Sequence, residues 1–307
     1  MKTVCVALQQ FCEMDARPRR MLEENGFQVQ ENHLKRRLTS TEMPGFLKEA
    51  DAVIAGVEPY DERLLRQMPK LRLISRCGAG TDSIDEDAAR ALRIAVRATP
   101  EVVVEPVAQL TVAMILALAR NFPGHLSDFR QGFWTKRAGH LLSEWTVGLV
   151  GFGRIGRRVG DYLRPFGVRI VVFDPRMDPG TSFEGVTIGD FEMLLKEADL
   201  VSLHAGRRKE EGPLMRAHEF SLMKRGSFLV NTARGYLVEE AALLAALQRG
   251  HLAGAALDVF EEEPYTGPLM KLPQVICTPH VATLTKSSRA AMELEAAQNV
   301  VTFFNGK

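Results

Sequence analysis

The chain of 307 residues is poor in cysteine, and its four cysteines are widely separated. They form no Cys-x-x-Cys pair and are too sparse for a disulfide framework, so we expect reduced thiols and a cytoplasmic protein. Metal-binding patterns are also missing, because the seven histidines make neither an HxxxH nor an HExxH arrangement. The sequence therefore favours neither a disulfide-stapled fold nor metal catalysis.

An excess of charge of either sign is absent as well. The chain has 39 Lys and Arg against 38 Asp and Glu, so it offers no overall field to attract nucleic acid or an anionic membrane. We interpret the basic stretch at 33–37 as a solvated face rather than a nucleic-acid contact. The longest apolar run, at 110–119, is about half the length that a bilayer requires, and the run at 4–8 is too short for a secretory signal. We expect a small-molecule partner, with no nucleic acid and no membrane.

What the chain does contain is a glycine-rich turn between a strand and a helix. Gly151, Gly153 and Gly156 follow an apolar strand at 147–150 and lead into a helix at 154–163. The first glycine permits a sharp turn, the second lets the backbone approach a pyrophosphate, and the third allows the helix to pack close to the sheet. The N-terminal N–H groups of the helix then face the phosphates. This pattern predicts a dinucleotide-binding site.

An acidic residue lies where the two nicotinamide dinucleotides are distinguished. Asp174 follows the strand at 169–173, eighteen residues beyond Gly156. A carboxylate there can accept hydrogen bonds from both hydroxyls of an adenosine ribose and repel a 2′-phosphate, so NAD is favoured over NADP. Asp-Pro is also a common turn opener, and Arg176 nearby is able to tolerate a 2′-phosphate, so the strictness of this preference stays open.

Short apolar strands alternate with helices on both sides of the glycine turn, and this alternation predicts parallel sheets with helices on both faces. Before the turn we expect helices at 21–25, 61–67 and 85–92 and strands at 4–8, 28–30, 52–55, 71–75 and 94–96. From the turn onward we expect helices at 154–163, 190–197, 217–223 and 238–249 and strands at 147–150, 169–173, 200–203, 228–231 and 253–257.

The length of the chain suggests two domains of about 150 residues each. A long helix at 100–120 separates the two series, and a final helix at 286–304 comes after the second series is complete, so we expect that helix to return to the first domain. The connection at 122–145 has no clear period. The predicted fold is α/β, with two Rossmann-like or flavodoxin-like domains of doubly wound parallel sheet and a cleft between them. The predicted domains are an NAD-binding domain at 99–283 inserted into a substrate domain at 1–98 and 284–307.

Three side chains with catalytic potential occur in the second series. Arg234, Glu263 and His280 each come shortly after an apolar strand. Because ligands bind at the carboxyl ends of the strands in doubly wound sheets, we expect the three side chains at one edge. Each alone has an ordinary interpretation, as a surface ion pair, a solvated acid and a loop histidine. Together they supply a cation, an acid and an imidazole beside a nicotinamide.

Oxidation of a 2-hydroxy acid needs these three groups. Histidine titrates near neutrality and can take the hydroxyl proton. A carboxylate on its other ring nitrogen fixes the tautomer and stabilises the imidazolium. A planar bidentate donor suits the substrate carboxylate and the developing 2-oxo group, which favours arginine over lysine.

Five motifs occur in the order of a known family, at 76–85, 151–156, 231–235, 258–264 and 278–280. On these motifs the chain resembles the D-isomer-specific 2-hydroxyacid dehydrogenases, and most resembles their phosphoglycerate dehydrogenase-like branch. The resemblance implies an NAD-dependent oxidoreductase that acts on a CH–OH group. It also implies a homodimer, with the helix at 104–120 and the connection after it at the interface.

The resemblance implies roles residue by residue. The implied catalytic residues are Arg234, Glu263 and His280, and the implied substrate contacts are Arg234 and the backbone N–H groups of Ala79 and Gly80. Asp258 is implied to hold the nicotinamide carboxamide. The implied cofactor contacts are Gly151, Gly153, Arg154, Ile155, Gly156, Asp174, Thr232, Arg234, Asp258 and His280, and no metal is expected.

Three departures from the family pattern bear on the substrate and the interface. The phosphoglycerate branch often carries an arginine in the loop at 55–59. This chain has no arginine there, so the phosphate contact that the arginine implies is not expected from this loop. The basic residues at 207–209 follow His204 where the family usually has His-x-Pro, and we interpret them as a solvated loop or as a substitute anion contact. Gln109 stands where an acid is usual, which we interpret as a change at the interface.

These observations predict an NAD-dependent D-2-hydroxyacid dehydrogenase that transfers a hydride between NAD(H) and a small 2-hydroxy or 2-oxo acid. The candidate substrates are D-3-phosphoglycerate with 3-phosphohydroxypyruvate, glyoxylate or hydroxypyruvate, and lactate-like acids. The alternative from another class is an NAD-sensing, corepressor-like binding protein. A short-chain dehydrogenase is excluded because the chain has no Tyr-x-x-x-Lys, and Glu263 argues against a formate dehydrogenase, in which glutamine pairs with the histidine.

Overall fold

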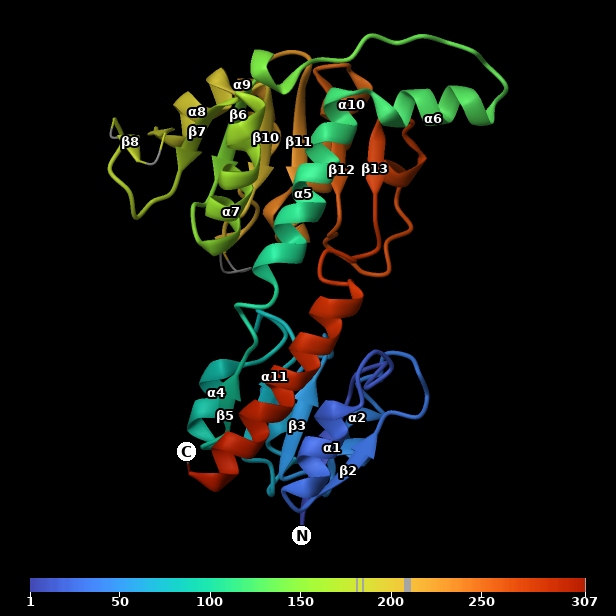
Figure 1. Ribbon diagram of the computed structural model, residues 1–307, viewed down its shortest axis with the longest axis vertical. Coiled ribbons are helices and arrows are strands. Elements are labelled where there is room, and N and C mark those ends of the chain that lie inside the picture. The colour runs from blue at the N-terminus through green and yellow to red at the C-terminus, as the bar shows by residue number, and fades with distance from the viewer. Residues whose placement is uncertain (181, 184, 207–210, 307) are drawn as a thin grey trace. The chain divides into compact units, whose positions relative to one another are not determined.

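The structure is a computed structural model that describes residues 1–180, 182–183, 185–206 and 211–306 (Figure 1). The chain divides into two compact units. Unit 1 consists of Met1–Val103 together with Thr283–Lys307, and unit 2 consists of Val104–Ala282. Unit 2 is therefore an insertion within the sequence of unit 1.

Unit 1 contains a five-stranded sheet in which all strand pairs are parallel. The strand order β2-β1-β3-β4-β5 is one of the two common doubly wound orders. All four residues of β3 are buried, as expected for a central strand with helices on both faces. The strands are β1 (Lys2–Val6), β2 (Phe27–Glu31), β3 (Ala52–Ala55), β4 (Leu73–Arg76) and β5 (Ala95–Arg97).

Helices cover both faces of the sheet of unit 1. On one face, α1 (Arg17–Glu24) and α11 (Lys286–Asn305) pack against β1 and β3, so that Val300 lies in one apolar cluster with Val6 and Ile54. The other face is covered by α2 (Met43–Leu47), α3 (Glu62–Leu65) and α4 (Glu86–Ala91). The long helix at the end of the chain thus completes the core of unit 1.

Unit 2 contains an eight-stranded sheet of order β13-β12-β11-β10-β6-β7-β9-β8, in which β8 alone is antiparallel. The short β8–β9 hairpin was not predicted, because strands of two and three residues carry almost no periodicity. The strands are β6 (Thr146–Val150), β7 (Arg169–Phe173), β8 (Ser182–Phe183), β9 (Val186–Ile188), β10 (Leu200–Leu203), β11 (Ser227–Asn231), β12 (Leu252–Leu257) and β13 (Val275–Cys277). The predicted pair of doubly wound parallel sheets is confirmed.

Helices also cover both faces of this second sheet. On one face, α5 (Val104–Ala119) and α7 (Arg154–Leu163) bury Ile115 and Val159 against Leu149 of β6. The other face is covered by α8 (Phe191–Glu197), α9 (Ala217–Leu222) and α10 (Glu240–Gln248). Strand β6 lies between β7, which follows it in the chain, and β10, which comes later, so the strand order reverses direction at β6. In doubly wound sheets, ligands bind at the carboxyl ends of the strands where the order reverses.

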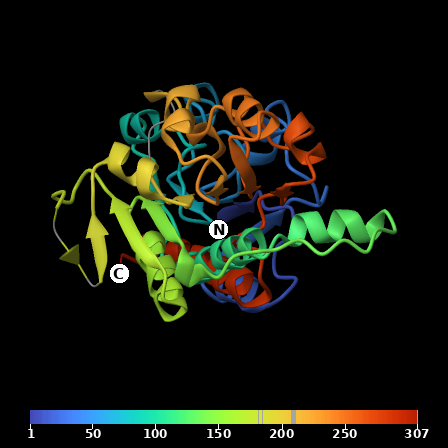
Figure 2. The same cartoon turned by 90° about the horizontal axis from the view of Figure 1, so that it is seen from above.

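The connection between α5 and β6 contains a further helix. Helix α6 (Phe122–Arg130) and the segment after it extend away from the sheet of unit 2 (Figures 1 and 2), and the segment returns where the His140 N–H donates to the Ala119 carbonyl. Within the described residues no single helix is long and apolar enough to cross a membrane. The pair α5 and α6 meets that criterion only when taken together, with a bend of 67° between them.

Candidate active site

The glycine turn after β6 has the geometry that its three glycines predict. Gly151 has a φ of +92°, and a Cβ there would lie 2.6 Å from the carbonyl oxygen of His204. A Cβ at Gly156 would lie 2.2 Å from the carbonyl oxygen of Gly151, so only glycine lets α7 begin this close to the turn. A Cβ at Gly153, by contrast, would have no heavy atom within 4 Å. Protein atoms therefore fill the space beside Gly151 and Gly156, whereas the space beside Gly153 is empty. A pyrophosphate needs this free space to approach the backbone.

Asp174, at the end of β7, is tied to this turn. Its carboxylate is buried, and Oδ2 accepts the Phe152 N–H at 2.9 Å. Arg176 donates its backbone N–H and Nε to Oδ1, both at 3.0 Å, and Nη2 to Oδ2 at 2.9 Å. The guanidinium holds the pKa of the Asp174 carboxyl well below its usual range, against the opposing effect of burial. Asp174 is thus a fixed carboxylate beside the glycine turn, and Arg176 covers it.

His204 lies on the other side of the turn, at the end of β10. Its Nε2 forms a hydrogen bond of 2.9 Å with the Ser202 hydroxyl. Burial lowers the pKa of His204 to about 4, so the imidazole is neutral at pH 7. The basic residues at 207–209, predicted to be a solvated loop or an anion contact, lie outside the described residues.

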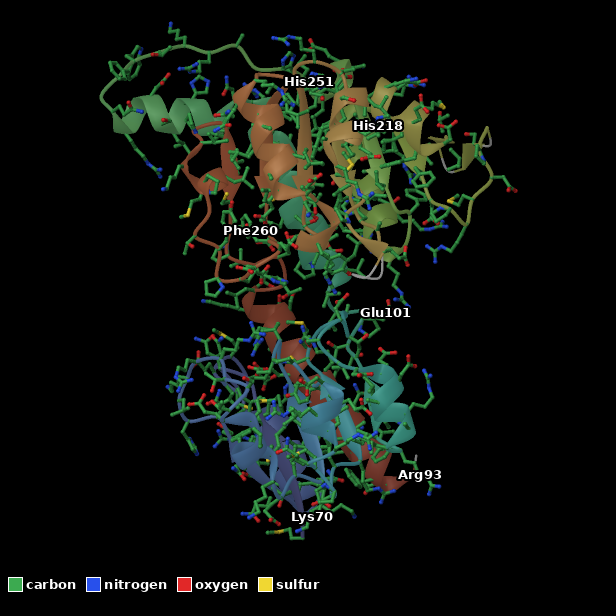
Figure 3. The ribbon with its side chains drawn as sticks, turned by 180° about the vertical axis from the view of Figure 1, so that it is seen from behind. Lys70, Arg93, Glu101, His218, His251 and Phe260 are labelled. Atoms are coloured by element: carbon green, nitrogen blue, oxygen red, sulfur yellow. The ribbon has the colours of Figure 1, made fainter. Side chains whose placement is uncertain are left out.

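The carboxyl ends of β11, β12 and β13 carry the three candidate catalytic side chains. These strands are neighbours in the sheet, so the turns after them meet at one edge of unit 2. Figure 3 shows His251, which precedes β12, and Phe260, which follows it, at opposite ends of this unit, and Phe260 marks the edge concerned. The structure therefore brings Arg234, Glu263 and His280 to the same edge.

The turn after β13 pairs an imidazole with a carboxylate. His280 Nδ1 lies 2.8 Å from Glu263 Oε2, and Glu263 Oε1 accepts the Phe260 N–H at 3.1 Å. Because an ionised carboxylate only accepts, Nδ1 carries the hydrogen and Nε2 is left for a substrate. Both side chains are partly exposed, at 41% and 34%. The pair thus has the orientation of an acid–base catalyst that a reactant can reach.

Asp258, the first residue after β12, holds the turn that carries His280. It is fully buried, and its carboxylate accepts the Thr278 hydroxyl at 2.5 Å and the N–H groups of Val281 and Ala282 at 2.8 and 2.9 Å. The His280 N–H donates to the Asp258 carbonyl at 2.9 Å, and His280 adopts a φ of +53°. Asp258 therefore maintains a left-handed conformation at His280 that a non-glycine residue rarely adopts. Its contact with the nicotinamide carboxamide stays a prediction.

The turn after β11, which carries Arg234, packs against the segment after β12. Asn231 caps the turn by donating Nδ2 to the Arg234 carbonyl at 2.8 Å. A Cβ on Gly235 would lie 1.9 Å from the backbone carbon of Phe260, so the turn packs directly on the segment that leads to Glu263. Thr232 is buried and forms a hydrogen bond of 2.7 Å with Thr111 of α5, a contact that no local pattern indicated. Packing thus sets the spacing of Arg234 and Glu263.

In unit 1, the loop after β4 presents two backbone donors. Arg76 donates Nε to the Gly80 carbonyl at 3.0 Å and Nη1 to the Cys77 carbonyl, and the Gly78 N–H donates to the Thr99 hydroxyl at 2.8 Å. The N–H groups of Ala79 and Gly80 have no acceptor among the residues that the structure describes. The sequence motif contained Arg76, but the structure shows that its guanidinium shapes this loop.

A second loop of unit 1, after β3, contains a buried acid. Glu58 is 1% exposed and its Oε2 has no hydrogen-bond partner among the described residues. Burial raises the pKa of the Glu58 carboxyl above its usual range. Arg37 from the basic stretch reaches this loop and donates Nη2 to the Val57 carbonyl at 2.7 Å.

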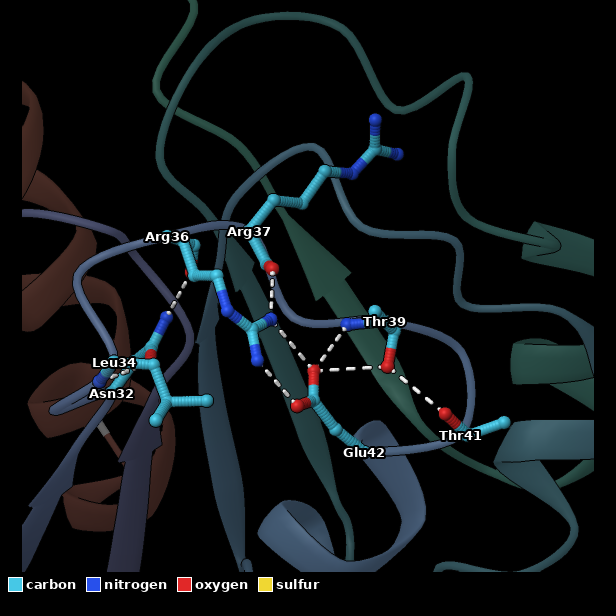
Figure 4. A network of polar contacts seen from close by, with 7 residues as sticks. All are labelled: Asn32, Leu34, Arg36, Arg37, Thr39, Thr41 and Glu42. Atoms are coloured by element: carbon cyan, nitrogen blue, oxygen red, sulfur yellow. Dashed lines mark hydrogen bonds and ion pairs between the residues drawn. The ribbon is translucent and has the colours of Figure 1, made fainter.

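The basic stretch itself is partly neutralised within the chain. Arg36 donates Nη1 and Nη2 to the two oxygens of Glu42 at 2.9 and 2.6 Å, and the Thr39 N–H and hydroxyl also donate to Glu42 (Figure 4). The guanidinium of Arg36 and these Thr39 donors lower the pKa of the Glu42 carboxyl to about 2. Arg36 is therefore exposed and paired within the chain, and the solvated face of the stretch at 33–37 stays a prediction.

Comparisons with known proteins give the family. Residues 112–282 match the model of the D-isomer specific 2-hydroxyacid dehydrogenase NAD binding domain. A glyoxylate reductase of Thermococcus litoralis is 37% identical over 273 residues, which are 85% of this chain and 82% of that protein. A D-3-phosphoglycerate dehydrogenase of Mycobacterium bovis is 35% identical over 257 residues, which are 82% of this chain but only 49% of that protein.

A solved structure agrees with these relatives. The NAD-bound 3-phosphoglycerate dehydrogenase of Entamoeba histolytica superposes with a TM-score of 0.84 at 25% identity, over all of this chain and 96% of that one. The glycine turn, with its open side at Gly153, fits the cofactor of this family. The chain belongs to the D-isomer-specific 2-hydroxyacid dehydrogenases and is an NAD-dependent oxidoreductase that acts on a CH–OH group.

Proposed function

We propose that His280 is the acid–base catalyst of this dehydrogenase and that Glu263 orients it. The single observation that carries the proposal is the 2.8 Å contact between His280 Nδ1 and Glu263 Oε2. With Nδ1 held by the carboxylate, Nε2 faces the substrate and exchanges the hydroxyl proton. The negative charge of Glu263 stabilises the imidazolium that forms when the hydroxy acid is oxidised.

Arg234 completes the proposed catalytic group. Its guanidinium binds the substrate carboxylate and polarises the 2-oxo oxygen, because a planar fork of donors matches both groups. Bound NAD supplies the hydride acceptor. The packing of Gly235 on the Phe260 backbone supports a fixed spacing between Arg234 and Glu263.

In unit 1, the loop after β4 has the features of a carboxylate site. Its Ala79 and Gly80 N–H groups are without acceptors among the described residues, and Arg76 holds the loop through the Cys77 and Gly80 carbonyls. Two adjacent backbone N–H groups form a small anion-binding concavity. We infer that they bind the carboxylate that all 2-hydroxy acids share.

For the rest of the substrate, we propose a small unphosphorylated 2-oxo acid, glyoxylate or hydroxypyruvate. The loop at 55–59 contains the buried acid Glu58 and no arginine, which does not favour a phosphate. The glyoxylate reductase named above also matches this chain over most of its length. A second candidate is 3-phosphohydroxypyruvate, because Arg37 brings a guanidinium to this loop through its hydrogen bond with Val57.

A panel of 2-oxo acids tests these proposals. NADH consumption is measured with glyoxylate, hydroxypyruvate, pyruvate and 3-phosphohydroxypyruvate. A preference for the phosphorylated acid of about a hundredfold in kcat/KM, lost in Arg37→Ala but retained in Lys35→Ala, would establish the second candidate. A His280→Ala protein that binds NADH and keeps the wild-type rate contradicts the catalytic assignment. No turnover of any acid favours a corepressor-like binding protein.

We also propose a homodimer whose interface includes α6 and the segment after it. This part of unit 2 exposes an unusual number of large apolar side chains, and the rings of Phe129 and Trp134 lie 5.7 Å apart. Contiguous exposed apolar surface of this kind marks an interface. Gln109, which stands where an acid is usual, lies in the first half of α5 and donates to Glu105 at 2.8 Å. The exposed side chains are Phe122, Leu126, Phe129, Phe133, Trp134 and Leu141.

Sedimentation equilibrium tests the homodimer. The wild-type chain is expected to sediment as a dimer, and a Phe129→Ser, Trp134→Ser double variant is expected to shift to the monomer. A Met270→Ser variant removes one exposed apolar side chain from another part of unit 2 and serves as the control. A monomeric wild-type protein overturns the proposal.

A further inference from the structure

The carboxylate that distinguishes the two nicotinamide dinucleotides is already saturated with hydrogen bonds. Asp174 Oδ1 accepts two N–H groups of Arg176, and Oδ2 accepts one from Arg176 and one from Phe152. A carboxylate offers about four lone-pair sites in total. No site is left for the two ribose hydroxyls that this carboxylate is expected to bind unless the Arg176 side chain moves.

The two partners differ sharply in exposure. The Asp174 side chain is 3% exposed, whereas the Arg176 side chain is 76% exposed. The guanidinium lies in solvent and keeps its hydration when it leaves the carboxylate, and the ribose hydroxyls of a bound dinucleotide can then donate to the oxygens that it vacates. Its remaining N–H donors, on Nη1 and Nη2, have no partner within the described part of the chain. Arg176 is therefore the solvent-accessible partner at the rim of the dinucleotide site.

The contact also changes the charge that a dinucleotide meets. An isolated carboxylate repels a 2′-phosphate and selects NAD. Here a guanidinium bonded to both carboxylate oxygens offsets that negative charge. Guanidinium groups bind phosphate through parallel N–H···O bonds, and an arginine close to this carboxylate can accommodate a 2′-phosphate.

We propose that Arg176 determines dinucleotide specificity, by covering Asp174 and pairing with a 2′-phosphate, so that this chain accepts NADP(H) as well as NAD(H). The proposal depends on the dinucleotide site at the glycine turn and is independent of the substrate. It adds a second cofactor to the NAD that the family uses. It also assigns a function to a side chain that lies outside the glycine motif and the catalytic group.

Direct binding measurements test the proposal without catalysis. NADH and NADPH are titrated separately into the wild-type protein at fixed ionic strength, and the dissociation constants are obtained from dinucleotide fluorescence or calorimetry. The wild-type protein is expected to bind NADPH within about tenfold of NADH. Arg176→Ala is expected to weaken NADPH by roughly ten- to hundredfold, the effect of losing charged hydrogen bonds, and not to weaken NADH.

Arg169→Ala is the matched control. Arg169 is an exposed arginine at the start of β7, the strand that ends just before Asp174, and it pairs with Glu197 at 2.7 Å. Its replacement by alanine changes the net charge by the same amount as Arg176→Ala. This variant is expected to leave both affinities unchanged. Equal weakening of NADH and NADPH in Arg176→Ala, or unchanged NADPH binding, overturns the proposal. If the wild-type protein does not bind NADH, the dinucleotide site itself is wrong and the proposal fails with it.

Discussion

His280 Nδ1 lies 2.8 Å from Glu263 Oε2, although seventeen residues separate the two in the sequence. Glu263 is held at its other oxygen by the Phe260 N–H, so neither end of the carboxylate is loose. The imidazole is held by its turn and by this carboxylate together. The geometry is that of an oriented acid–base catalyst, and it leads to a first prediction.

Replacing Glu263 by glutamine keeps the size of the side chain and removes its charge. Because the imidazolium loses its counter-charge, Glu263→Gln is expected to lower kcat by about a hundredfold. The dissociation constant of NADH, measured by fluorescence titration, is expected to stay the same. Glu262→Gln removes a neighbouring acid and is expected to retain full activity. Equal losses of kcat in the two variants would contradict the prediction, because the acidic run would then act only through its overall charge.

The contacts of Asp258 predict that the turn at 278–282 depends on this one carboxylate. Asp258→Asn replaces an acceptor oxygen by an NH₂ group, so at least one buried N–H of this turn loses its partner. We expect the free energy of unfolding to fall by about 1–3 kcal/mol, together with a fall in kcat as His280 is displaced. Urea denaturation and steady-state assays measure the two effects. Thr278→Val removes only one donor to Asp258 and is expected to cost less.

Burial of His204 predicts a dependence of stability on pH. Its pKa is about 4 in the folded chain against an ordinary value of 6.5, so the unfolded chain binds the extra proton first as the pH falls. The free energy of unfolding therefore declines as the pH falls from 6.5 towards 4, by up to about 2 kcal/mol at pH 5. His204→Gln cannot titrate and is expected to lose less stability between pH 7 and pH 5. Identical pH profiles of the two proteins contradict this assignment.

Alanine at two glycines of the same turn is expected to affect different properties, stability at Gly151 and NADH binding at Gly153. Gly151→Ala combines a φ of +92° with a Cβ 2.6 Å from the His204 carbonyl, and we expect a loss of about 2 kcal/mol or more in unfolding free energy. Gly153→Ala meets no atom within 4 Å, so its stability is expected to change by less than about 1 kcal/mol. Its NADH affinity is expected to fall, because the new methyl occupies the open side of the turn. Thermal unfolding and NADH titration separate the two effects.

Local sequence patterns predicted most of the fold. Strands such as 52–55 and 147–150 are continuous apolar runs in the sequence and lie buried between helix layers in the structure. The sequence did not predict a structure for the connection at 122–145. The hydrophobic residues of α6 face outward, so no periodic buried stripe marks the helix. The β8–β9 hairpin was missed for its shortness.

By itself the sequence determined the glycine turn, the family and the identity of the candidate catalytic residues, because each depends on residues close together in the chain. Only the tertiary structure decided which atoms meet. Three features arise from contacts between the ends of different strands or from the folding back of a turn. They are the pairing of His280 with Glu263, the close approach of the His204 carbonyl to Gly151, and the saturation of Asp174 by Arg176 and Phe152. Such contacts depend on sheet order and side-chain direction, which residue spacing along the chain does not specify.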